Sequence, residues 1–221
     1  MNRKKLGFTL IEIAVTFAVL AIATALGIGI IFRSLPKMRI RGDAWNIHQT
    51  LLNAKMTAVA EKVNIGVMFV YRGQYGGDDI CKDQDCYFIF KDANGDNQYT
   101  NLDGKIFHQC EFIDPTKGCT VANEDIIIGR IKKLHSANTF HQIFGTLMNN
   151  TGQTAAIYFN ALGNSTWYNM YTSPNVLPFN GGEILIRTRI PVDKTTNRYV
   201  VGGVSISKVA GNISIIPPQV Q

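Results

Sequence analysis

The first part of the chain is a continuous apolar run over residues 8–32, in which Glu12 is the one ionisable side chain. A helix rises about 1.5 Å per residue, so a helix of this length crosses the roughly 30 Å hydrocarbon core of a bilayer with some tilt. The pattern therefore predicts a transmembrane helix over residues 8–32.

Beyond the run, apolar residues recur at three- and four-residue intervals, which is typical of an amphipathic helix. They are Ile40, Ala44, Ile47, Leu51, Ala54 and Ala58. We predict that the helix continues over residues 33–62, with Pro36 and Gly42 marking a kink or a short break. The opposite face is mostly polar, at Asp43, Asn46, Gln49, Asn53 and Lys55.

From Asn64 onward the periodicity changes to two, and β-branched and aromatic residues become frequent. The predicted strands cover residues 65–71, 86–91, 126–134, 154–160, 167–171, 183–190, 198–207 and 212–216. Clusters of glycine, asparagine and aspartate separate them, at 73–79, 94–96, 149–152 and 180–182. One long helix followed by a mostly antiparallel β region is an α+β fold, with a globular β-rich domain over residues 63–221.

The charge of the chain is concentrated near its start. The leader, residues 1–7, holds three of the 22 basic residues and no acidic one, so its removal lowers the formal charge from +6 to +3. The basic composition is therefore weak evidence for nucleic-acid binding. A second basic cluster follows the apolar run, and this position favours contact with lipid headgroups over DNA; it comprises Arg33, Lys37, Arg39 and Arg41.

Two kinds of cleavable leader are compatible with a basic start and an apolar stretch. A secretory signal would be cut after Ala25, in the small-residue segment Ala23-Thr24-Ala25, and would release a soluble binding protein that begins at Leu26. Glu12 interrupts such a stretch, and the apolar run continues past Ala25. An uncleaved anchor is a third alternative, but it leaves a carboxylate in lipid without a partner.

The segment Lys4-Lys5-Leu6-Gly7-Phe8-Thr9-Leu10-Ile11-Glu12 resembles the signal of type IV prepilins: a short basic leader, a glycine, an aromatic residue and a glutamate. The resemblance implies a pilin-like fold, cleavage by prepilin peptidase between Gly7 and Phe8, and methylation of the new terminus at Phe8. It also implies that Glu12 pairs with the Phe8 amine of an adjacent subunit. A single pass through the bacterial inner membrane, with the domain in the periplasm, follows from the same family.

Three further stretches resemble the H-type minor pseudopilin and its pilus counterparts. They are Leu51-Leu52-Asn53-Ala54-Lys55 leading to Val67-Met68-Phe69, Phe90-Lys91-Asp92-Ala93-Asn94-Gly95-Asp96, and Ile157-Tyr158-Phe159-Asn160-Ala161-Leu162-Gly163. This resemblance implies a non-enzymatic, low-abundance subunit at or near a filament tip. Its partners would be other pilins, the assembly platform of the inner membrane and membrane lipid. The machine would be a type II secretion pseudopilus or a type IV pilus, and the sequence does not choose between them.

The four cysteines form two close pairs, Cys81 with Cys86 and Cys110 with Cys119, and neither pair has the spacing of a zinc site. Disulfides formed in an oxidising compartment are the favoured interpretation. Three connectivities are open, of which we favour pairing within each short interval.

One polar segment has oxygen ligands at a spacing similar to that of an EF-hand: Asp92, Asn94, Asp96, Gln98 and Asp103. Asn97 stands where that loop needs a glycine, and Asp103 is shorter than the usual glutamate. We therefore favour a hairpin turn at Asn94-Gly95, with calcium as the alternative and no other cofactor expected.

No residue pattern indicates catalysis, because the four histidines are scattered and no nucleophile elbow or phosphate-binding loop is present. A thin basic surface near the C-terminus is a weak candidate for DNA uptake, and we regard DNA as an unlikely partner. Its candidate residues are Arg187, Arg189 and Arg198.

Overall fold

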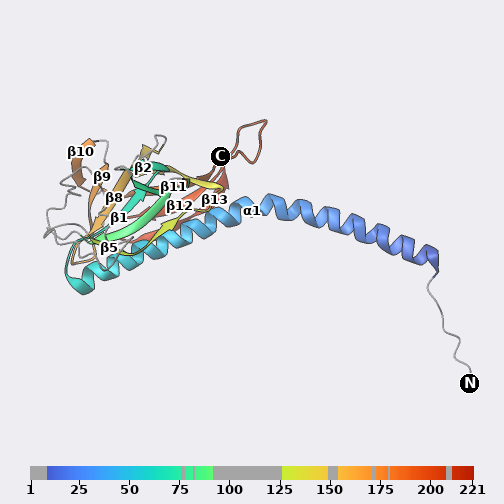
Figure 1. Cartoon of the computed structure of the whole chain (residues 1–221), viewed down its shortest axis with the longest axis horizontal. Coiled ribbons are helices and arrows are strands. Elements are labelled where there is room, and N and C mark those ends of the chain that lie inside the picture. The colour runs from blue at the N-terminus through green and yellow to red at the C-terminus, as the bar shows by residue number, and fades with distance from the viewer. Residues whose placement is uncertain are drawn as a thin grey trace, which may run out of the picture.

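The computed structural model describes residues 9–75, 78–81, 83–91, 126–148, 154–170, 173–178, 180–207 and 211–221. One long helix extends far beyond a domain of antiparallel sheets that packs along its C-terminal half (Figure 1). The predicted α+β, pilin-like architecture is thereby confirmed.

The helix, α1, covers Leu10–Glu61. At its start the Thr9 hydroxyl accepts a hydrogen bond from the Glu12 amide, and the Glu12 carboxylate accepts one from the Thr9 amide, which is a capping box. Lys62 ends the helix in a left-handed conformation, with φ of 55°. The helix is continuous through Pro36 and Gly42, so of the two predicted alternatives, a kink or a short break, the break is wrong. Figure 1 shows a bend near the middle of the helix.

The strands form two main antiparallel sheets. The larger has the order β10-β9-β8-β1-β4-β5, with bounds Ser173–Pro178, Ser165–Met170, Thr154–Phe159, Ile65–Val70, Cys86–Lys91 and Ile126–Lys133. The smaller has the order β13-β12-β11-β6-β7, with bounds Ile213–Val220, Val200–Ile206, Gly182–Thr188, Asn138–Ile143 and Thr146–Leu147. A two-stranded ribbon, β2 (Gly73–Tyr75) with β3 (Asp78–Cys81), lies outside both sheets.

All eight predicted strands are present, with boundaries shifted by a few residues. The structure has five further strands that the sequence pattern does not predict: β2, β3, β6, β7 and β10. Glycines make the β2–β3 ribbon resemble a turn, two prolines make β10 resemble a loop, and polar residues dominate the start of β6. The last, β7, is two residues long. In each case the hydrogen-bonding partner strand, and not the local composition, creates the strand.

The main core lies between α1 and the sheets, because α1 packs chiefly on β12, β13 and β1. All six predicted helix positions, from Ile40 to Ala58, are fully buried there. Strand β1 is buried along its whole length, since its other face meets a second apolar cluster that contains Phe90 and Tyr158. Gly66 of β1 leaves the space that the Phe90 ring fills.

Asp85 is a buried carboxylate that joins the two sheets. It accepts hydrogen bonds from the Arg72 amide at 3.1 Å, the Thr139 hydroxyl at 2.7 Å and the Phe140 amide at 2.6 Å, and the Arg189 guanidinium lies 3.8 Å away. Asp85 precedes β4 of the larger sheet, whereas Thr139 and Phe140 belong to β6 of the smaller one. One side chain therefore ties the start of β4, in the larger sheet, to β6 of the smaller sheet.

Asp43 connects α1 to the turn before β6. Its oxygens accept hydrogen bonds from the His135 amide at 3.0 and 3.2 Å and from the Asn138 side-chain amide at 2.6 Å. The side chain is 7% exposed. The expectation that Asp43 lies on a polar outer face of the helix is thus wrong, because the β5–β6 turn covers it.

Replacing Asp85 by alanine should lower the free energy of unfolding by about 3–5 kcal/mol, because Arg189 and three donors lose their buried acceptor. Urea unfolding of the full chain in a non-ionic detergent measures the change. Asp83→Ala, an exposed position in the same loop, is the matched control and should behave like the wild type. Equal stability of the two variants would contradict the role of Asp85.

Burial raises the pKa of Asp43 above its ordinary value of 3.8. The hydrogen bonds from Asn138 and His135 lower this pKa, but the effect of burial is larger. A raised pKa means that the folded state holds the proton more tightly than the unfolded chain. The protonated Asp43 carboxyl therefore stabilises the folded state. This stabilisation is complete below pH 3.8 and is lost as the pH rises through the pKa of Asp43 in the folded state. The stability of the wild type relative to Asp43→Asn should therefore fall from acidic to neutral pH in the same unfolding assay. A difference that grows with pH would refute this.

Candidate assembly face of the long helix

The N-terminal half of α1 has no covering within the described chain. The segment Leu10–Ile28 has a mean hydropathy of 2.2, is long and apolar enough to cross a membrane, and is not buried by any other element. Leu10, Ile11 and Phe17 are between 67% and 87% exposed. Apolar side chains in such density require either lipid or another protein around them.

Glu12 lies one turn into this exposed half. Its Oε2 atom accepts hydrogen bonds from the amide and the hydroxyl of Thr9, each at 3.1 Å. The carboxylate is therefore directed toward the N-terminal end of the helix, where the partial positive charge of the backbone amides also favours it. Among the described residues no cation pairs with Glu12.

The domain half of α1 carries a second apolar surface, which we call the outer stripe: Met38, Trp45, Leu52, Met56 and Val59. Met38, Trp45, Leu52 and Val59 are spaced by seven residues, which keeps them on one side of a helix. Met38, Met56 and Val59 are 66%, 68% and 47% exposed, and Leu52 is half-buried. At 3.6 residues per turn the stripe lies roughly opposite the buried face.

The sequence analysis does not identify the outer stripe. Polar residues between its members, such as Gln49 and Asn53, lead to the prediction that this face is mostly polar. The signal was present in the seven-residue spacing of Met38, Trp45 and Leu52. Without the structure, however, nothing indicates which of the two apolar rows packs on the domain.

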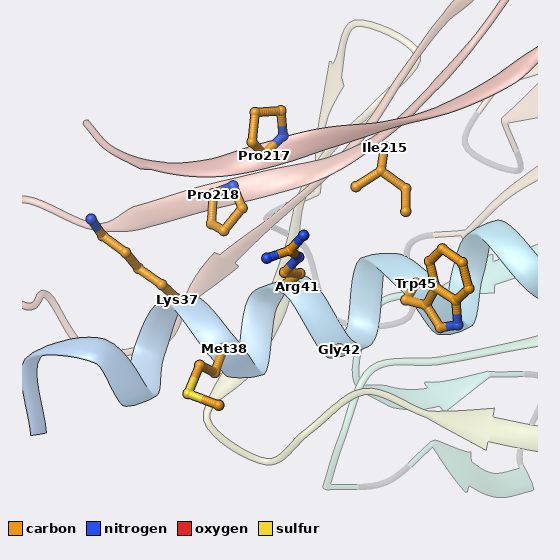
Figure 2. A pocket seen from close by; sticks show the side chains of 8 residues that line it. All are labelled: Lys37, Met38, Arg41, Gly42, Trp45, Ile215, Pro217 and Pro218. Carbon is orange, nitrogen blue, oxygen red and sulfur yellow. The ribbon is translucent and has the colours of Figure 1, made fainter. Parts of the chain in front are cut away.

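A groove of about 880 Å³ runs beside α1, between the helix and the edge strand β13 (Figure 2). The helix contributes Lys37, Met38, Arg41, Gly42 and Trp45, and the strand contributes Ile215, Pro217 and Pro218. Figure 2 shows Arg41 extending toward Pro218, Lys37 extending away from both prolines, and Met38 on the other side of the helix. Because proline lacks an amide hydrogen, this part of β13 offers fewer donors to a further strand.

Several predicted sites lie outside the described residues. These are Gly7 and Phe8 of the cleavage site, Cys110 and Cys119, and the calcium candidates Asp92, Asn94, Asp96, Gln98 and Asp103. Calcium binding therefore stays a prediction. Within the described ranges no group of three or more histidine, cysteine, aspartate or glutamate side chains could hold a metal ion. The local disulfide between Cys81 and Cys86 is present, with 5.7 Å between the Cα atoms.

Of the three arginines predicted as candidates for nucleic-acid binding, Arg187 and Arg189 contact other groups of the protein. The Arg187 guanidinium lies 4.9 Å from the centre of the Tyr199 ring, and the Arg189 guanidinium donates hydrogen bonds to the carbonyls of Asn138 and Asp83. Arg198 is exposed on the loop that follows β11. Their binding of nucleic acid stays a prediction.

Comparison with protein-family models identifies one match. Residues 2–28 match the model described as the prokaryotic N-terminal methylation motif. Neither the curated proteins nor the solved structures include a match to this chain. The matched segment contains Gly7, Phe8 and Glu12 and continues into the exposed apolar half of α1.

The motif marks a prepilin-peptidase substrate that assembles with other pilins, and its apolar helix is the membrane anchor of such a protein. With that helix packed on antiparallel sheets, the chain is a type IV pilin-like protein.

Proposed function

We propose that the chain is a non-enzymatic minor pilin or minor pseudopilin of the H-type. It is anchored in the bacterial inner membrane with its β-rich domain in the periplasm, and it enters a type II secretion pseudopilus or a type IV pilus. The observation that carries this proposal is the helix α1, which presents two apolar surfaces that the described part of its own domain does not cover.

The two surfaces fit successive environments of one subunit. Before assembly, lipid covers the half that includes Leu10–Ile28. On assembly, helices of neighbouring subunits replace that lipid, and the same helices reach the outer stripe, from Met38 to Val59. Burying each exposed methionine or tryptophan side chain contributes roughly 25 cal/mol per Å² of apolar area, so this stripe favours association over the free subunit.

Glu12 supplies the polar contact that sets the axial position of a subunit. A carboxylate at the centre of a bilayer costs about 2.5–3.5 kcal/mol unless it has a partner. Cleavage after Gly7 creates an ammonium group at Phe8, and Glu12 of one subunit can pair with that group of the next. The Oε1 atom of Glu12 has no hydrogen bond in the described chain, which leaves an acceptor for this pairing.

Two of the segments that resemble the H-type proteins lie next to each other in the structure. Val67 of β1 pairs with Ile157 of β8 in one sheet. The turn after β8 includes Gly163, with φ of 74°, where a side chain would meet Val59 and Lys55 of α1. The assignment to the H-type thus rests on the sequence resemblance of segments that are neighbours in the fold.

The proposal predicts different effects of two substitutions in the N-terminal segment. In cells with a prepilin peptidase, Gly7→Val should prevent removal of the leader, because a side chain there blocks close approach to the backbone. Glu12→Ala should be cleaved normally but incorporated into filaments about tenfold less, since a lost contribution of 1.4 kcal/mol or more changes the equilibrium by that factor. Mass spectrometry of the N-terminus and quantification in sheared filaments measure the two effects.

Glu61→Ala is the matched control, because Glu61 is a carboxylate at the other end of α1 whose surface pair with Lys91 should contribute little. It should be cleaved and incorporated like the wild type. A mature chain that begins at Leu26 would refute the proposal in favour of a secreted soluble protein. Normal incorporation of Glu12→Ala would refute the pairing.

A substitution in the outer stripe should separate assembly from folding. Met56→Glu places a charge on an exposed position, so the stability of the domain should change by less than about 0.5 kcal/mol. Incorporation into filaments should nevertheless fall several-fold, because the charge would face apolar neighbours. Asn53→Glu, an exposed position of α1 outside the stripe, is the control and should assemble normally. Equal incorporation of both variants would exclude the stripe from the interface.

A further inference from the structure

The loop between β11 and β12 projects from the end of the domain at which α1 leaves it (Figure 1). We call residues 190–198 the tip loop. Its last part is next to the C-terminus, since the backbones of Tyr199 and Gln221 exchange two hydrogen bonds of 2.9 Å. The tip loop also reaches α1, because Ile190, Pro191 and Val192 line one pocket together with Pro36 and Arg39.

Hydrogen bonds within the tip loop define its conformation, and apolar side chains lie on its outer surface. The Asp193 carboxylate accepts hydrogen bonds from the Thr195 amide at 2.9 Å and the Thr196 hydroxyl at 2.5 Å. The Val192 amide donates to the Arg198 carbonyl at 2.8 Å. These bonds close the turn, yet the side chains of Ile190 and Val192 remain 69% and 43% exposed.

Five exposed cations lie in the tip loop and in the turns of α1 at this end of the domain, and Arg39 lines the same pocket as Ile190 and Val192. The tip loop contributes two exposed cations and the adjacent turns of α1 contribute three: Lys194, Arg198, Lys37, Arg39 and Arg41. In the described part of the chain none of the five forms an ion pair. Asp193 is the acidic residue of the tip loop, and its carboxylate is occupied by the turn itself. Aliphatic side chains among unpaired cations are the composition that binds the surface of an anionic bilayer.

The height of the tip loop above the membrane follows from the pocket that it shares with Pro36. Pro36 comes four residues after the end of the apolar run at Phe32, which is about 6 Å of helix. The headgroup layer on each side of the hydrocarbon core is roughly 5–8 Å thick. When residues 8–32 span the bilayer, the tip loop therefore lies level with the lipid headgroups.

We propose that the tip loop is a second membrane contact of this subunit. Ile190 and Val192 enter the headgroup layer of an anionic bilayer, and Lys194 and Arg198, with the cations of α1, bind the lipid phosphates. The inference rests on the proposed membrane anchoring of residues 8–32. Because the domain is fixed on α1, such a contact sets the rotation of the whole subunit about the α1 axis before assembly, and it breaks when the subunit leaves the bilayer.

A single reporter tryptophan tests this contact in the full chain. Trp45→Phe and Trp167→Phe remove both native tryptophans, and Val192→Trp then places one at the tip loop. The protein is reconstituted into phosphatidylcholine vesicles with or without phosphatidylglycerol, and quenching by brominated lipid is measured. The matched control replaces Leu162, which is 79% exposed in the turn after β8, near the C-terminal end of α1.

In vesicles with phosphatidylglycerol we expect brominated lipid to quench the reporter at 192 and to leave the one at 162 unaffected. Adding Lys194→Glu and Arg198→Glu should weaken the contact by about tenfold or more, since each cation near an anionic surface contributes about 1 kcal/mol. The same reversal at Arg130 and Lys133, two exposed cations of β5 in the other sheet, should have no effect.

The possible failures are distinguishable. A chain that does not float with the vesicles would overturn the membrane anchor itself, and with it this inference. A chain that floats while the reporter at 192 stays open to aqueous iodide, as at 162, would overturn the inference alone. Protection from iodide without quenching by brominated lipid would mean that another copy covers the tip loop, which also overturns it.

Discussion

Half of the long helix has no partner within the described part of its own chain, and the rest of the structure can be understood from this constraint. The domain covers one face of the C-terminal half of α1 and leaves Leu10–Ile28 entirely open. Such a surface is unstable in water. A subunit of this design therefore exists in lipid or packed against other subunits. In the proposed function it occupies the lipid first and the filament afterwards.

The attachment of the domain decides which side of the helix remains for partners. Ile40, Ile47 and Leu51 enter the core completely, and Asp43 binds the turn before β6. These contacts fix the rotation of α1 about its axis. The outer stripe must then face away from the sheets, while the groove lies between the helix and the edge strand β13 (Figure 2). A helix held less firmly would present no constant surface to a neighbour.

The end of the domain near the membrane has a different chemistry from the outer stripe. There the exposed aliphatic side chains of the tip loop stand among cations, whereas the stripe is apolar and lies along the helix. Lipid headgroups match the first composition and apolar helices match the second. The two surfaces could thus act at different stages of the life of a subunit, one before extraction from the bilayer and the other after it.

The sequence by itself determined the features that depend on local order. Gly7, Phe8 and Glu12 form a contiguous motif, the length of the apolar run defines the span, and alternating residues identify eight strands. Close spacing likewise favoured the pair Cys81–Cys86. Each of these signals depends on neighbours along the chain, so no knowledge of the fold is needed to recognise it.

The tertiary structure alone decided what depends on distant partners. β6 and β10 become strands because neighbouring strands bind their backbones, and Asp43 is buried because a turn some 90 residues later covers it. The choice between the two apolar rows of α1, and the contact of the tip loop with Pro36, are likewise set by packing between remote segments. Periodicity shows that a helix has an apolar face, but only the packed domain determines which face is left for other molecules.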